Sequence, residues 1–157
     1  MSMVQARFLG ALLIAGSALT PANAEPAAWT PLQLSLWNPV QLAPGDWDVW
    51  GIRLNAGYGL NRTLYGLDCG LVNVLHGTFM GVQAGAANLA PAGGSALSGL
   101  GRGVQLAFFV NVAGSLDGLQ LGFSNNAEDL AGLQLGGLNL ADRMAGVQCG
   151  LVFNTIL

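Results

Sequence analysis

The chain has 157 residues, of which 52% are hydrophobic and only 8% are charged. This length suits one domain with its own core and is short for two. From residue 25 onward there are four arginines, no lysine and eight acidic residues, which gives a formal charge of −4. Nucleic acid and anionic lipid both require clustered basic side chains, so the composition argues against either as a partner.

Residues 1–24 predict a secretory signal peptide. Arg7 supplies one positive charge, residues 8–19 form an uninterrupted apolar and small run, and Ala22 and Ala24 form a small-x-small cleavage site. The apolar run is shorter than the ~20 residues that a membrane-spanning helix needs. We therefore expect cleavage after Ala24 and export to the cell envelope, meaning the periplasm, outer membrane or cell surface.

Residues 25–50 are rich in tryptophan and proline and predict an N-terminal cap. This segment contains Trp29, Trp37, Trp47 and Trp50, with Pro31, Pro39 and Pro44 as breaks. In a stack of coils, the first coil must hide its end and block its open edge. In a membrane barrel the same tryptophans would join an interfacial aromatic girdle, and a carbohydrate-stacking platform is a third interpretation.

Residues 51–157 form a repeat domain built from units of the form Gly-Leu-Gln-Leu-Gly-x-x-Asn. Residues 51–55 are a degenerate first copy, and six clear copies follow it. These start at Gly66, Gly81, Gly103, Gly118, Gly132 and Gly146, with spacings of 15, 22, 15, 14 and 14 residues. The long spacing contains a stretch rich in Pro, Gly, Ser and Ala, which predicts an inserted loop at about residues 89–102.

Each copy has two halves with different patterns. The Leu-Gln-Leu core alternates apolar and polar residues, which is typical of a strand with one buried face. The Asn-x-Ala-x-x-(Leu/Met) segment that follows predicts a second, inward-facing segment. A β-solenoid uses both halves, and it stacks equal positions about 4.8 Å apart.

Stacking would align the amide side chains of successive copies into two ladders, which hydrogen-bond along the stack. The Gln ladder contains Gln83, Gln105, Gln120, Gln134 and Gln148, with Asp68 at its end. The Asn ladder contains Asn73, Asn88, Asn111, Asn125, Asn139 and Asn154. These ladders are the candidate structural or interaction sites of the chain.

The pattern therefore predicts an all-β fold, a short β-solenoid of 14–15-residue coils with an aromatic N-terminal cap. The alternative is an eight-stranded antiparallel outer-membrane β-barrel, because residues 33–37 and the degenerate copy bring the strand count to an allowed barrel size. A barrel does not need an apolar pair in fixed phase in every repeat. The phased second half therefore favours the solenoid.

The two cysteines occupy the same position of two different copies. Cys69 and Cys149 stand where Leu121 and Leu135 stand in others, so each is expected to act as a small buried hydrophobe. Export permits a disulfide, but no second Cys or His lies at metal-ligand spacing near either one.

The remaining reactive residues do not form a catalytic pattern. The single histidine, His76, lies in an expected turn, where a histidine is usually solvated. The serines Ser95, Ser98 and Ser115 lack a nucleophile motif. The acidic pairs Asp46 with Asp48 and Glu128 with Asp129 could serve a glycosidase, yet each flanks turn residues. We expect no enzyme, cofactor or metal.

Residues 34–42, residues 51–61 and the Gly-Leu-Gln-Leu-Gly-x-x-Asn units together resemble the bacterial secreted surface-repeat proteins. The resemblance covers most of the chain after residue 24, although Asp68 replaces Gln and Ala107 replaces the second Gly. It implies an envelope or surface location and transfers no activity. We expect a non-enzymatic structural or interaction protein that presents its Gln ladder outward to a protein or envelope component; the alternative is a small outer-membrane barrel protein.

Overall fold

The computed structural model describes residues 28–91 and 100–156. The predicted signal peptide, residues 1–24, and residues 92–99, in the expected inserted loop, lie outside the described residues. The described chain is all-β: the strands are β1 (Trp29–Trp37), β2 (Val40–Gln41), β3 (Asp48–Asn61), β4 (Thr63–Leu75), β5 (Phe79–Ala90) and β6 (Leu100–Ile156). No helix in this part of the chain is long and apolar enough to cross a membrane.

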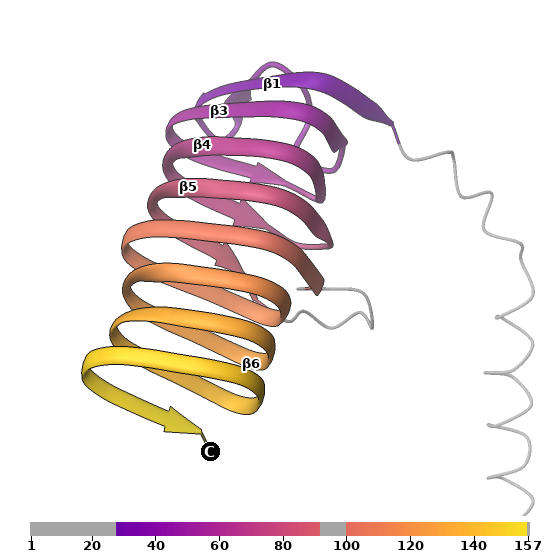
Figure 1. Cartoon of the computed structure of the whole chain (residues 1–157). Helices are drawn as coiled ribbons and strands as arrows, with labels where there is room; N and C mark the ends of the chain where they lie inside the picture. The colour runs from indigo at the N-terminus through magenta and orange to yellow at the C-terminus, as the bar shows by residue number, and fades with distance from the viewer. Residues whose placement is uncertain (1–27, 92–99, 157) are drawn as a thin grey trace, which may run out of the picture.

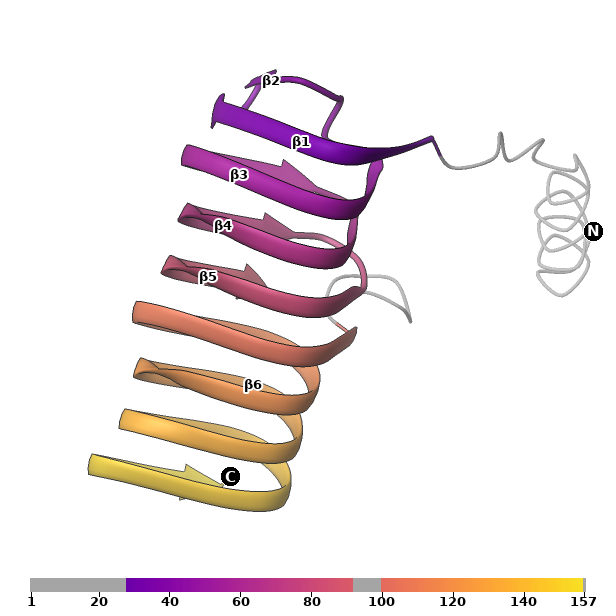
Figure 2. The same ribbon diagram turned by 45° about the horizontal axis from the view of Figure 1, so that its top comes forward.

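The strands form one sheet in the order β2-β1-β3-β4-β5-β6. Every neighbouring pair is parallel except β1 with β2, which is antiparallel. The chain winds as a solenoid-like stack, and β6, which is 57 residues long, continues through successive coils (Figures 1 and 2). Parallel pairing does not fit the antiparallel barrel that the strand count allowed.

The repeat copies align position by position in this sheet. Gly51 pairs with Gly66, Gly66 with Gly81, and Gly81 with Gly103, so the inserted loop does not shift the register. Strand β3 begins at Asp48, three positions before the expected first copy. Strand β1 is a further copy, since Gln33 pairs with Arg53 and Leu34 with Leu54.

The second halves of the copies supply an apolar core. Its buried members are Val49, Leu64, Leu75, Phe79, Ala90, Ala113, Leu116, Ala127, Leu130 and Ala141, with Met144 packed against them. The inward-facing Ala and Leu expected from the Asn-x-Ala-x-x-Leu pattern are thus confirmed.

The first halves are oriented opposite to expectation. Gln83, Gln105, Gln120 and Gln134 are fully buried, whereas Leu121, beside Gln120, is 44% exposed. Because side chains alternate between the two faces of a strand, an inward Gln forces both flanking apolar residues outward. The expectation that the Gln ladder faces a partner on the outside is therefore wrong.

The same alternation places the cysteines on the outer face. Both are free, with Cys69 half-buried and Cys149 exposed, so the expectation of two buried thiols is wrong. We expect a water-soluble thiol reagent such as a thiol-reactive disulfide dye to label Cys149 several-fold faster than Cys69 in the native protein and both equally in urea. Equal native rates for the two thiols would contradict this assignment.

Candidate functional site

The Gln ladder runs through the interior of the stack. From Gln105 onward, each Nε2 donates to the Oε1 of the Gln one coil earlier, while its other N–H faces a backbone carbonyl across the coil, such as Asn126 O at 3.2 Å from Gln120. The ladder distances are 2.9 Å for Gln105 to Gln83, 2.8 Å for Gln120 to Gln105, 2.7 Å for Gln134 to Gln120 and 2.8 Å for Gln148 to Gln134. A polar interior is tolerated here because its amide groups have partners.

The Asn ladder has the opposite direction. Each Nδ2 donates to the Oδ1 of the Asn one coil later, and several also reach a backbone carbonyl of that coil, as Asn111 does to Leu121 O at 2.9 Å. The ladder distances are 2.8 Å from Asn73 to Asn88, 2.9 Å from Asn88 to Asn111, 2.9 Å from Asn111 to Asn125, 2.8 Å from Asn125 to Asn139 and 2.8 Å from Asn139 to Asn154. Each coil therefore presents a Gln donor and an Asn acceptor to the previous coil, and a Gln acceptor and an Asn donor to the next one.

Toward the N-terminus the Gln ladder ends on a buried ion pair. Arg53 and Asp68 occupy the Gln position of their coils and are both completely buried. Asp68 accepts two hydrogen bonds from the Arg53 guanidinium, one from Gln83 Nε2 at 3.1 Å and one from Asn55 Nδ2 at 3.1 Å. Beyond Arg53, the Gln33 side chain pairs with the backbone N–H and C=O of Ala43 at 2.8 Å each, so the Gln ladder is closed at this end.

The Asn ladder begins with a residue that sequence reasoning did not include. Asn55 is aligned with Gly70, while Gly59 occupies the Asn position opposite Asn73. The Asn55 side chain fills the space left by Gly59, where a Cβ would lie 2.0 Å from Asn55 Oδ1. From there Asn55 Nδ2 donates to Asn73 Oδ1 at 2.8 Å.

The last described coil leaves both ladders unfilled. Within the described residues, no donor reaches Gln148 Oε1 and no acceptor reaches Asn154 Nδ2, although both residues bond the coil before them. The apolar side chains of this coil are also uncovered, with Leu151 95% exposed. This end therefore has the polar and apolar groups that every other coil uses to contact its successor.

Aromatic side chains of the first coils form a short row on the outer surface. The Trp29 and Trp50 rings lie 5.8 Å apart, and the Trp50 and Tyr65 rings 5.5 Å apart. Trp29 and Trp50 are exposed. Such contacts between neighbouring rings stabilise adjacent strands. Here they join β1, β3 and β4 on the outer surface.

The titratable residues are dispersed as ion pairs and solvated groups. Asp48 accepts a hydrogen bond from Arg62 at 2.9 Å and Asp129 pairs with Arg143, contacts that raise the pKa of each arginine. His76 is exposed in a bend, as expected. Ser95 and Ser98 lie outside the described residues, and no group of three metal-ligating side chains occurs in the parts of the chain that are described.

No protein-family model matches the chain, and no curated protein or solved structure matches it either.

Proposed function

We propose that the protein is a non-enzymatic structural component of the bacterial cell envelope or surface, exported through its signal peptide. It is a short β-solenoid of 14–15-residue coils with an aromatic N-terminal cap, and a second copy of the chain docks on its last coil. The observation that supports this most directly is the pair of unfilled amides, Gln148 Oε1 and Asn154 Nδ2.

The chemistry of that end specifies its partner. Gln148 offers an acceptor and Asn154 a donor, so the partner strand must present a donor at the first position and an acceptor at the second. Two last coils that face each other can meet this requirement, because each brings both an acceptor, Gln148 Oε1, and a donor, Asn154 Nδ2. The uncovered strand edge adds backbone groups ready to pair with another strand, and the exposed apolar side chains add contact area.

The opposite end is less suited to the same contact. The Gln33 amide is already paired with Ala43, and β2 covers part of the outer edge of β1. The two ends of the stack thus differ, and association should depend on the last coil in particular.

Asn154→Asp tests this proposal. The substitution keeps the shape of the side chain and the Oδ1 that accepts from Asn139, but it replaces the outward Nδ2 donor with a charged oxygen. Losing a donor at a contact and leaving an acceptor unpaired costs about 1–3 kcal/mol, so the association constant should fall roughly 5- to 150-fold. The measurement is the sedimentation of the secreted protein as a function of its concentration.

Asn126→Asp is the matched control. Asn126 is exposed on the side of β6, so the same change in charge should leave association within about twofold. A wild-type protein that stays monomeric at all concentrations, or two variants with equal association constants, would refute docking at the last coil.

A further inference from the structure

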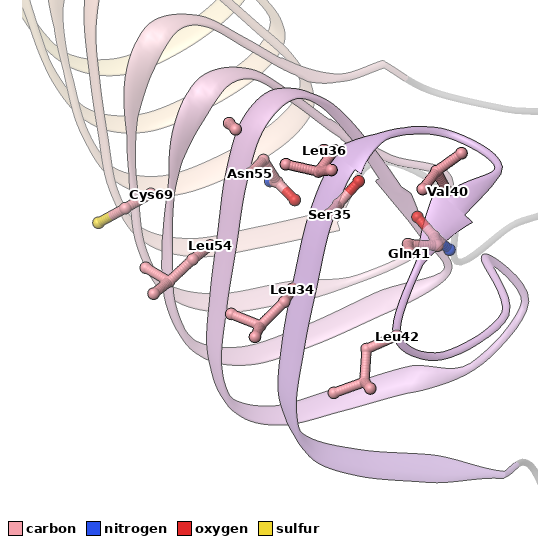
Figure 3. A pocket seen from close by; sticks show the side chains of 10 residues that line it. Leu34, Ser35, Leu36, Val40, Gln41, Leu42, Leu54, Asn55 and Cys69 are labelled. Carbon is pink, nitrogen blue, oxygen red and sulfur yellow. The ribbon is translucent and has the colours of Figure 1, made fainter.

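One outer face of the stack is apolar along its whole length. It is made by the first, third and fifth residues after the first glycine of each copy. In the seven copies of residues 51–157, these positions hold only Ile, Leu, Val, Ala, Phe, Cys and one Gly, and every side chain there is exposed or half-buried. Leu34, Leu54 and Cys69 share the third position of successive coils, and Figure 3 shows them projecting outward while Asn55 lies inside the coil. We call this surface the apolar face.

The apolar face is large and has no charged, amide or hydroxyl side chain. Strand β1 adds an eighth coil to it through Leu32 and Leu34. Eight coils spaced by 4.8 Å and five residues rising 3.3 Å each give an area of about 600 Å². At the far edge of the face Phe108, Phe109 and Phe123 are exposed, Phe108 by 75%. Monomeric proteins in water rarely leave so large an apolar patch uncovered, and such a patch marks an interaction site.

Polarity rises in steps beside the apolar face. The residues directly before the repeat glycines begin with the aromatic pair Trp50 and Tyr65, and Trp29 packs against Trp50. Two residues before this aromatic row lie Asp48 and Thr63, which are aligned with each other. The coil thus passes from aliphatic side chains through Trp and Tyr to charged and hydroxyl groups.

The later coils keep their charges away from the apolar face. The row directly before the glycines continues there with Arg102 and Asp117, which pair with each other. The second halves of the copies lie across the coil from the Gln ladder, as the contact of Gln120 with the carbonyl of Asn126 shows. These halves carry the other charged residues, Glu128, Asp129, Asp142 and Arg143.

This order of polarity matches a lipid surface better than a protein partner. In a bilayer Trp and Tyr lie at the level of the headgroups, between the acyl chains and water. A protein interface carries about one hydrogen bond per 100–200 Å², and the apolar face has no charged, amide or hydroxyl side chain to form one. A second copy of the chain would bring the same face and would lack these groups too. Acyl chains require none.

We propose that the apolar face lies on the surface of a neutral phospholipid bilayer. Its Leu and Phe side chains enter the boundary of the acyl chains, and the rings of Trp29, Trp50 and Tyr65 lie among the headgroups. Anionic lipid is not required, because all four arginines after residue 24 are paired with acidic residues and the formal charge of this part is −4. Binding should therefore depend little on ionic strength. The inference is independent of the association proposed at the last coil.

The test is flotation with phosphatidylcholine vesicles in a density gradient. The protein is used without residues 1–24, because the apolar residues 8–19 would themselves bind lipid. We expect the protein to float with the vesicles, and its partition coefficient to change less than about twofold with high salt or with added phosphatidylglycerol. Absence of flotation would overturn the proposal. Flotation only with phosphatidylglycerol at low salt would overturn the assignment to neutral lipid.

Matched variants in one coil localise the contact. Leu135 lies on the apolar face and Leu140 lies across the same coil, where its carbonyl accepts from Gln134; both leucines are half-buried. Leu135→Glu should weaken partition at least tenfold, and Leu140→Glu should leave it within about twofold, with circular dichroism verifying both folds. Equal effects would refute the apolar face as the contact. Asn154→Asp should float like the wild type, so a failure of the last-coil proposal is seen separately.

Labelling of Cys69 tests the same contact without any substitution. Cys69 lies on the apolar face five coils before the last copy, so association at the last coil does not cover it. Phosphatidylcholine vesicles should slow its reaction with a water-soluble thiol reagent several-fold, as measured by mass spectrometry of the labelled peptide. An unchanged rate would contradict the proposal. Protection that rises with protein concentration in the absence of lipid would identify a second copy as the occupant and overturn it.

Discussion

Arg53→Gln and Asp68→Gln, each made alone, are expected to lower the free energy of unfolding by about 3–5 kcal/mol. The double variant should recover most of that loss. Each single change leaves the other charge fully buried without its counter-ion, which is the most costly way to break a buried ion pair.

The recovery follows from the repeat itself. Arg53 and Asp68 stand at the position that holds Gln in the other copies, so two glutamines at these places can extend the ladder from Gln83 toward Gln33. A neutral amide supplies one donor group and one acceptor, which is what each rung requires. The ion pair thus takes the place of two glutamines within the Gln ladder.

Urea unfolding of the wild type, the two single variants and the double variant gives the coupling energy directly. The control is the exposed pair Arg102 and Asp117, with side chains 71% and 66% exposed. Substituting Gln at both of these positions should change stability by less than about 1 kcal/mol. If the effects of Arg53→Gln and Asp68→Gln simply add in the double variant, the two residues do not form a coupled buried unit.

The period of the stack was predictable from sequence, but the direction of its side chains was not. Copies spaced 14 or 15 residues apart align in the sheet because equal positions pair with one another. Alternation along Leu119, Gln120 and Leu121 is equally compatible with either residue type facing inward, and hydrophobicity alone favours Leu. The deciding energy comes from contacts between copies, since a buried Gln is satisfied only when another Gln lies one coil away.

A sequence clue to the correct direction does exist. From Gln83 onward every copy has Gln at this position, whereas the flanking position of the same copies varies among Ala84, Leu106 and Cys149. A position that must bond its own equivalent tolerates less variation than one facing solvent.

Two further features could be recognised only from the three-dimensional structure. The content of Trp and Pro placed β1 within the predicted cap, although Leu32, Gln33 and Leu34 repeat the Leu-Gln-Leu core. The relation between Asn55 and Gly59 cannot be read from the sequence. Each residue departs from the repeat motif, and only the structure shows that the Asn55 side chain fills the space beside Gly59.

Gly103→Ala is expected to lower the free energy of unfolding by about 2–5 kcal/mol, through backbone strain and overpacking. Gly103 has a φ of +130°, which residues with a Cβ rarely adopt. A Cβ there would lie 2.0 Å from the carbonyl oxygen of Gly81, one coil earlier. Because that oxygen belongs to the backbone of the neighbouring strand, relief of the clash requires the two coils to move apart, which would stretch the Gln105 to Gln83 bond nearby.

Urea unfolding measures the loss, and Gly137→Ala is the control. Gly137 has no positive φ, and its nearest neighbour, Phe123 O, would lie 3.1 Å from the new Cβ. Its cost should stay within about 1 kcal/mol. If both alanine variants proved equally stable, close contact between the first glycines would not limit the spacing of the coils, and the regular return of glycine at that position would need another cause. If only Gly103→Ala is destabilised, the spacing that brings the amides within hydrogen-bond distance is set by these glycines.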